Sequence, residues 1–106
     1  MSINQLVTLC TVSDREVGER IAHALVEERL AACVNLVPGL TSIYRWRGKV
    51  ERQGECLLLI KTTAARFATL KQRLKELHPY ELPEIIAVSI ADGDSAYLAW
   101  IMENTR

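Results

Sequence analysis

Two long strand-type segments, separated by a tight turn, most constrain what this chain can fold into. Residues 32–47 and 50–62 are rich in β-branched, aliphatic and aromatic residues, and Gly48-Lys49 is predicted to form the turn between them. At about 3.3 Å per residue, arms of roughly 13 residues or more extend about 40 Å. A domain of this length has a radius of gyration near ~13 Å. We therefore expect the hairpin to project past its own core.

The tip of this hairpin carries apolar side chains that would be more stable if another surface shielded them from water. It carries Ile43, Tyr44, Trp46 and Val50, and a two-stranded ribbon on its own is marginal in water. Partner chains that cover the ribbon would remove these side chains from water, so the sequence predicts self-association. The alternative is a hairpin that curls back onto its own domain.

Strand and helix patterns alternate along the whole chain in the order βαββαβ, followed by a short last helix. This order predicts one α+β domain over residues 1–106, a ferredoxin-like sandwich with an extended hairpin. The predicted elements are a strand over 3–11, a helix opened by the capping box Ser13-x-x-Glu16 and fading near residue 30, the hairpin with a bend or bulge at Pro38-Gly39, a helix capped by Thr63 and stopping at His78, a strand over 84–91, and a last helix capped by Asp94.

A bend with two prolines joins the second helix to the last strand. It reads His78-Pro79-Tyr80-Glu81-Leu82-Pro83-Glu84. Each proline fixes its own backbone and pushes the preceding residue toward extended geometry. The bend therefore holds an imidazole, a phenol and two carboxylates on a stiff connection. Connections of this kind often position functional groups, and a simple packing turn is the alternative.

The fold predicts which of these groups meet residues from elsewhere in the chain. In the ferredoxin-like strand order 4-1-3-2, we expect the first strand to run parallel to the third and antiparallel to the fourth. The ends of the first and third strands and the start of the fourth would then share one edge. That arrangement brings together Cys10, Lys61, Glu84 and His78.

Two members of this group have metal-binding chemistry. Cysteine and histidine ligate copper and zinc, and thiolate especially favours Cu(I). Cys10 and His78 alone are an incomplete site, which water, Glu81, Glu84 or a neighbouring subunit would have to complete. Both residues also have ordinary structural explanations. A cysteine in an apolar strand is usually a small core residue, and a helix C-terminus favours a charged histidine, which opposes ligation at low pH.

Composition argues against several functional classes. The 13 basic and 13 acidic residues balance, so the chain lacks the positive charge of a nucleic-acid binder. The basic tip residues Arg45, Arg47, Lys49 and Arg52 are interpreted as a solvated tip or a subunit contact. No apolar run approaches the roughly 20 residues of a membrane span, and the N-terminal residues lack a signal-peptide pattern. Three cysteines without CxxC spacing fit reduced thiols. We expect a cytoplasmic protein with neither nucleic-acid nor membrane partners, and no enzyme, because no nucleophile–base pair is evident.

Several motifs together resemble one known family. They are Glu28–Asn35, Pro38-Gly39, Tyr44–Gly48, Leu59–Thr62, His78-Pro79-Tyr80 with Pro83-Glu84, and Gly93–Trp100. In this order they are similar to the divalent-cation-tolerance protein CutA family. The resemblance implies a cytoplasmic homotrimer, similar to PII signalling proteins in fold and assembly. It also implies a role in tolerance of copper and other divalent metals.

The resemblance further implies two sets of site residues. Copper ligation in bacterial members carries over to Cys10 and His78, while Leu77 stands where some members have a second histidine, so copper is expected to bind weakly. An inter-subunit cleft of the family is lined by residues that match Cys33, Trp46, Lys61, Tyr80 and Glu84. The alternative function is that of a PII-like small-ligand sensor, in which Lys61 and the hairpin arginines hold an anionic metabolite.

Overall fold

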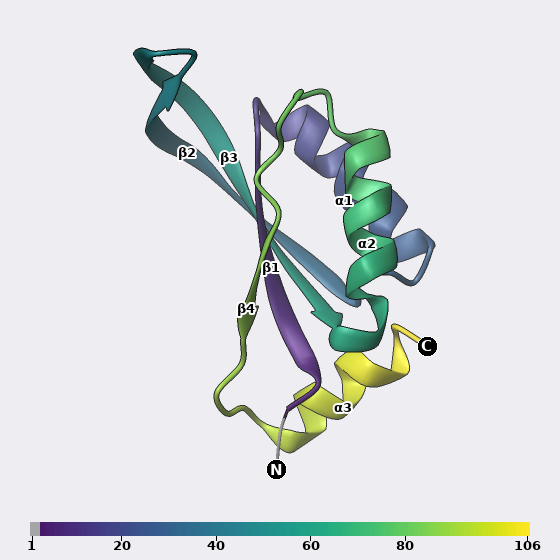
Figure 1. Ribbon diagram of the computed structural model, residues 1–106. Coiled ribbons are helices and arrows are strands. Elements are labelled where there is room, and N and C mark those ends of the chain that lie inside the picture. The colour runs from purple at the N-terminus through teal and green to yellow at the C-terminus, as the bar shows by residue number, and fades with distance from the viewer. Residues whose placement is uncertain (1–2) are drawn as a thin grey trace.

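The computed structural model describes residues 3–106 and shows an antiparallel four-stranded sheet with α1 and α2 on one face (Figure 1). The strand order is β2-β3-β1-β4, which confirms the predicted ferredoxin-like arrangement and its final helix. Met1 and Ser2, part of the N-terminal stretch considered for a signal peptide, lie outside the described residues. The elements are β1 (Gln5–Val12), α1 (Arg15–Glu27), β2 (Cys33–Trp46), β3 (Lys49–Thr63), α2 (Ala64–Leu77), β4 (Ile86–Ser89) and α3 (Ser95–Glu103).

One predicted strand direction is wrong. β1 runs antiparallel to β3 as well as to β4. The crossover through α1 makes β2 parallel to β1, and the hairpin turn then reverses the chain, so β3 must oppose β1. Cys10 consequently pairs with Leu58, whereas Lys61 lies opposite Val7. Three residues of strand separate the two positions by about 10 Å. The expected convergence of Lys61 with Cys10 therefore does not occur.

The hairpin of β2 and β3 extends beyond the rest of the sheet, as predicted. β1 follows β3 only as far as the Val12–Cys56 pair, while β2 and β3 stay paired out to Trp46 and Lys49. We call residues 40–46 and 49–55 the overhanging ribbon. The molecule measures 44 × 26 × 23 Å, and Figure 1 shows the ribbon projecting from one end. The hairpin does not curl back onto its own domain.

Local chemistry sets the irregularities of the hairpin. The predicted bulge is present as a register shift between Val37 and Leu40. The turn itself is one residue earlier than predicted, because Arg47 and Gly48 are its central residues and β3 begins at Lys49. Both central residues have positive φ, 51° and 81°. A two-residue turn needs this geometry to match the twist of its strands.

Helix ends mostly follow the predicted caps. Asp14, not Ser13, caps α1, and its Oδ1 accepts a hydrogen bond from Val17 N at 2.9 Å. The side chain of Asp94 caps α3 in the same way. α2 begins after Thr63, which makes no side-chain cap, and ends at Leu77, where the prolines interrupt the helix as predicted. β4 is shorter than predicted because it pairs with β1 over only four residues.

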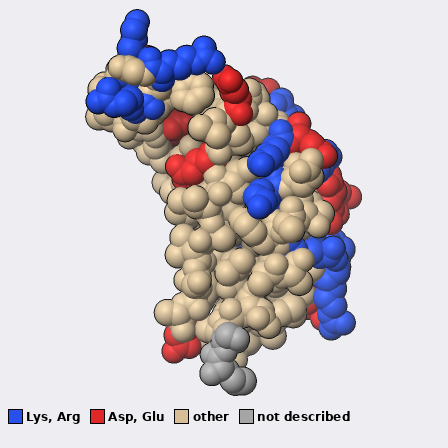
Figure 2. Space-filling model, viewed as in Figure 1, with Lys and Arg blue, Asp and Glu red and all other residues tan. Residues whose placement is uncertain are grey.

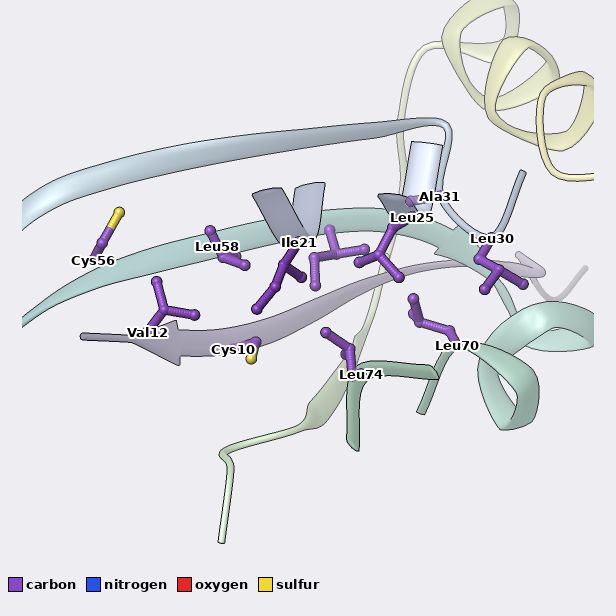
Figure 3. Close-up of a cluster of buried hydrophobic side chains, with 11 residues drawn as sticks. Cys10, Val12, Ile21, Leu25, Leu30, Ala31, Cys56, Leu58, Leu70 and Leu74 are labelled. Carbon is purple, nitrogen blue, oxygen red and sulfur yellow. The ribbon is translucent and has the colours of Figure 1, made fainter. Parts of the chain in front are cut away.

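The core lies between the sheet and the two helices on its covered face. Alternate residues of β1 and β3 point toward α1 and α2, and they include Cys10, Val12 and Leu58, which are fully buried (Figure 3). Neither α1 nor α2 covers the opposite face of the sheet (Figure 1). There Ile86 and Val88 remain 52% and 47% exposed. Within residues 3–106, no helix is long and apolar enough to cross a membrane.

Candidate functional site

Cys10 and His78, the two predicted metal ligands, meet at the end of β1. Both side chains point to the carbonyl oxygen of Thr11. His78 Nε2 lies 2.8 Å from it, and Cys10 Sγ donates a long hydrogen bond to it at 3.9 Å. His78 reaches this position because α2 ends at Leu77 and the proline strap, residues 78–85, begins there. The predicted approach of Cys10 and His78 is therefore present in the fold.

Both nitrogens of the His78 ring are already used. Nδ1 accepts a hydrogen bond from the backbone N–H of Tyr80 at 3.1 Å. In a neutral imidazole the other nitrogen then carries the proton, so Nε2 donates to Thr11 O. The side chain is buried, with 6% exposed. His78 thus ties the proline strap to the end of β1, and neither nitrogen has a free lone pair for a metal.

The thiol of Cys10 is also not in the form that binds a metal. Burial raises the pKa of its thiol from 9.0 to about 12, and the nearby carboxylates of Glu84 and Glu55 add to the rise. A metal binds the thiolate, not the thiol. Within residues 3–106, no three His, Cys, Asp or Glu side chains are grouped so that they could hold a metal ion. Cys10 and His78 therefore do not fit a preformed metal site in this fold.

A hollow of about 580 Å³ opens next to this point, between the overhanging ribbon, the proline strap and Thr11 at the end of β1. Three of the predicted cleft residues line it: Trp46, Tyr80 and Glu84. Figure 2 shows Lys and Arg side chains at the tip of the ribbon and acidic side chains just below them. At the rim, Arg47 Nη2 donates to Glu81 Oε2 at 2.9 Å.

A chain of hydrogen bonds joins the strap to the ribbon inside this hollow. Tyr44 OH donates to Gln53 Oε1 at 2.7 Å, Gln53 Nε2 donates to Tyr80 OH at 2.9 Å, and Tyr80 OH donates to Glu55 Oε2 at 2.7 Å. Burial and the bond to Glu55 raise the pKa of Tyr80. Sequence reasoning missed Gln53 and Glu55, because no motif contains them. Strand pairing places Gln53 opposite Ser42 and Glu55 opposite Leu40, and only the tertiary fold brings Tyr80 over both.

The other two predicted cleft residues lie elsewhere. Cys33 pairs with Lys61 across β2 and β3, far down the hairpin from the overhanging ribbon. Lys61 Nζ donates to Asn35 Oδ1 and lies 3.9 Å from Cys33 Sγ. Tyr97 of α3 joins this group, and burial followed by the contact with Cys33 raises its pKa. The five cleft residues thus form two separate groups within one chain.

Comparison with known proteins agrees along almost the whole chain. Residues 6–104 match the model of the CutA1 divalent ion tolerance protein family. The divalent-cation tolerance protein CutA of Thermus thermophilus is 62% identical over 99 residues, which are 93% of this chain and 96% of that protein. A solved structure of the Thermus thermophilus divalent cation tolerance protein superposes with a TM-score of 0.94 at 60% identity, covering 96% of this chain and 99% of that one.

A plant relative is similar over a shorter share of its length. The chloroplastic CutA protein of Arabidopsis thaliana is 42% identical over 105 residues, which are 99% of this chain but 58% of that protein. The match therefore covers this chain nearly completely in both bacterial and plant relatives. The chain belongs to the CutA1 divalent ion tolerance protein family.

Proposed function

We propose that this chain acts, without catalysis, as a cytoplasmic homotrimer in tolerance of divalent cations such as copper. Family membership carries this proposal, because the family model spans residues 6–104 and the Thermus relative is named for divalent-cation tolerance. Copper would be a transient ligand and not a resident cofactor. The partners would be metal ions and other copies of the chain, with no nucleic acid and no membrane among them.

The copper contact is proposed at Cys10 and His78, and two costs at these side chains would make it weak. His78 must first give up its hydrogen bond to Thr11 O or to the Tyr80 N–H. Cys10 must lose a proton from a thiol whose pKa burial has raised. Both costs reduce the affinity. Leu77 offers no further ligand beside His78.

A competition titration with a chromogenic Cu(I) chelator would test this assignment. Affinity should fall in Cys10→Ser and in His78→Ala, and it should rise with pH in the unmodified chain because ligation releases the thiol proton. Cys56→Ser is the matched control, since Cys56 is also a buried free thiol but is not one of the two proposed ligands. Equal affinity in all three variants would show that the metal binds elsewhere.

The trimer is supported by the apolar surface that the single chain leaves in water. Ile43 and Val50 on the overhanging ribbon are 70% and 66% exposed, and Ile86 and Val88 lie on the face of the sheet opposite α1 and α2. Covering these side chains would be favourable at roughly 25 cal/mol per Å². Light scattering should give three times the chain mass of 11.9 kDa, and Val88→Lys should lower it. A monomeric wild type would refute the trimer.

A second function, that of a small-ligand sensor, is favoured by the hollow beside Tyr80. Its volume of about 580 Å³ lies within the range of small-molecule sites, roughly 300–1,000 Å³. Lys61, which was expected to hold an anionic metabolite there, is bonded to Asn35 at the other end of the hairpin. A thermal-shift screen that includes nucleotides, organic acids and amines would test this function, because a true ligand stabilises the fold by mass action.

A further inference from the structure

The hollow contains negative charge that the chain itself does not neutralise. Glu55 is buried, with only 8% of its surface exposed, whereas Glu84, which also lines the hollow, is exposed to solvent. Neither forms an ion pair within residues 3–106. Tyr80 OH supplies one hydrogen bond to Glu55 Oε2. A buried carboxylate is normally paired with a cation, and Glu55 has no such partner within residues 3–106.

The walls of the hollow are suited to a positively charged ligand. Tyr44, Trp46 and Tyr80 all line it, and the faces of such rings attract cations. The chain already holds one cation at the rim by this chemistry. The Arg47 guanidinium carbon lies 5.4 Å from the centre of the Trp46 ring, while Arg47 Nη2 donates to Glu81 Oε2. Glu81 is therefore paired with a cation, whereas Glu55 and Glu84 form no ion pair within the described part of the chain.

The remaining cation at the hollow does not fill this role. Arg45 lines the hollow, but its Nη1 donates to the carbonyl of Gly48 in the turn at 3.4 Å. A bare metal ion is a poorer match than an organic cation, because no third ligand joins the two carboxylates within residues 3–106. An anionic ligand would face Glu55 and Glu84 without Lys61 to balance them.

We propose that this hollow binds a small organic cation with guanidinium or amino groups, held by Glu55 and Glu84 and covered by Tyr80 and Trp46. The proposal rests on the small-ligand function above and names the charge of its ligand. It does not depend on copper. A segment of a second chain is the competing occupant, and it would exclude the ligand.

Agmatine, which has a guanidinium at one end and an amine at the other, is a suitable probe. The chain has two tryptophans, so a Trp100→Phe background leaves Trp46 as the reporter of the hollow. We expect a saturable change in Trp46 fluorescence. Glu55→Gln and Glu84→Gln should each weaken binding about tenfold or more, since a hydrogen bond to a charged group contributes roughly 1.5–3 kcal/mol. The amide introduced by Glu55→Gln retains an acceptor for Tyr80 OH.

Matched controls separate this site from general charge effects. Glu51→Gln removes the same charge from the ribbon outside the hollow, and it should leave agmatine binding unchanged. Uncharged N-butylurea and anionic glutarate should give no saturable response. Cys10→Ser should retain agmatine binding even where copper binding is lost, so the two functions can fail independently.

Three results would overturn the proposal. The first is that agmatine does not bind saturably to the assembled wild-type protein. If binding then appears only after the assembly dissociates, a neighbouring chain fills the hollow. The second is equal agmatine affinity in the Glu55 and Glu84 variants and in wild type, with circular dichroism showing that the variants are folded. The third is a glutarate response equal to that of agmatine.

Discussion

The buried thiol of Cys10 provides the sharpest quantitative test of the site. Its pKa of about 12 compares with 9.0 for an ordinary cysteine. At pH 8 this difference lowers the thiolate fraction about a thousandfold, and the thiolate is the form that alkylating reagents attack. Full burial slows the reagent further. Iodoacetamide should therefore modify Cys10 at least about a thousand times more slowly in the folded protein than in denaturant.

Peptide mass spectrometry can follow each of the three cysteines separately during this reaction. The rate for Cys10 in denaturant at the same pH is the reference, so the reactivity of the other two cysteines does not enter the comparison. Native and denatured rates for Cys10 that agree within a factor of about ten would be incompatible with this burial, because they would require an exposed or readily ionised thiol.

The same pKa predicts how stability depends on pH. Below pH 9 the Cys10 thiol is protonated in both the folded and the unfolded chain, so its contribution is constant. Above pH 9 the unfolded chain loses the proton first, and stability falls until the folded thiol ionises near pH 12. Between pH 8 and 10 this loss is about 1.4 kcal/mol. Urea unfolding should show that loss in wild type and less of it in Cys10→Ala. Identical pH dependence in the two proteins would contradict it.

Three further substitutions test the fold around the site by urea unfolding at one fixed protein concentration. Tyr80→Phe leaves the buried Glu55 without its hydrogen bond and should cost about 1–3 kcal/mol, whereas Tyr44→Phe, at the exposed end of the same chain of bonds, should cost less. Gly48→Ala forces a side chain into a positive-φ turn and should cost about 1 kcal/mol, while Gly54→Ala, with open space around it, should not. Asp94→Ala removes the cap of α3 and should cost about 1 kcal/mol, with Asp92→Ala as its control. A control that loses as much stability as its partner would contradict the corresponding contact.

Much of the fold follows from local residue chemistry. Proline cannot continue a helix, so α2 ends at Leu77 as predicted. Asp94 offers a carboxylate to the free N–H groups that open α3. The long apolar hairpin was recognisable because β-branched residues and a glycine turn are local signals. The cap of α1 was misassigned because Ser13 and Asp14 are adjacent and both are good N-cap residues.

Residue patterns alone were enough to predict the order of the elements, the projecting hairpin and the meeting of His78 with the end of β1. They could not show what those groups do there. Whether Cys10 is a ligand depends on its burial, and whether His78 is free depends on the Tyr80 N–H and Thr11 O. The hollow and its unpaired Glu55 arise only where the strap passes the ribbon. These properties come from hydrogen bonds and desolvation between residues distant in the chain, so they are set only when the chain is folded.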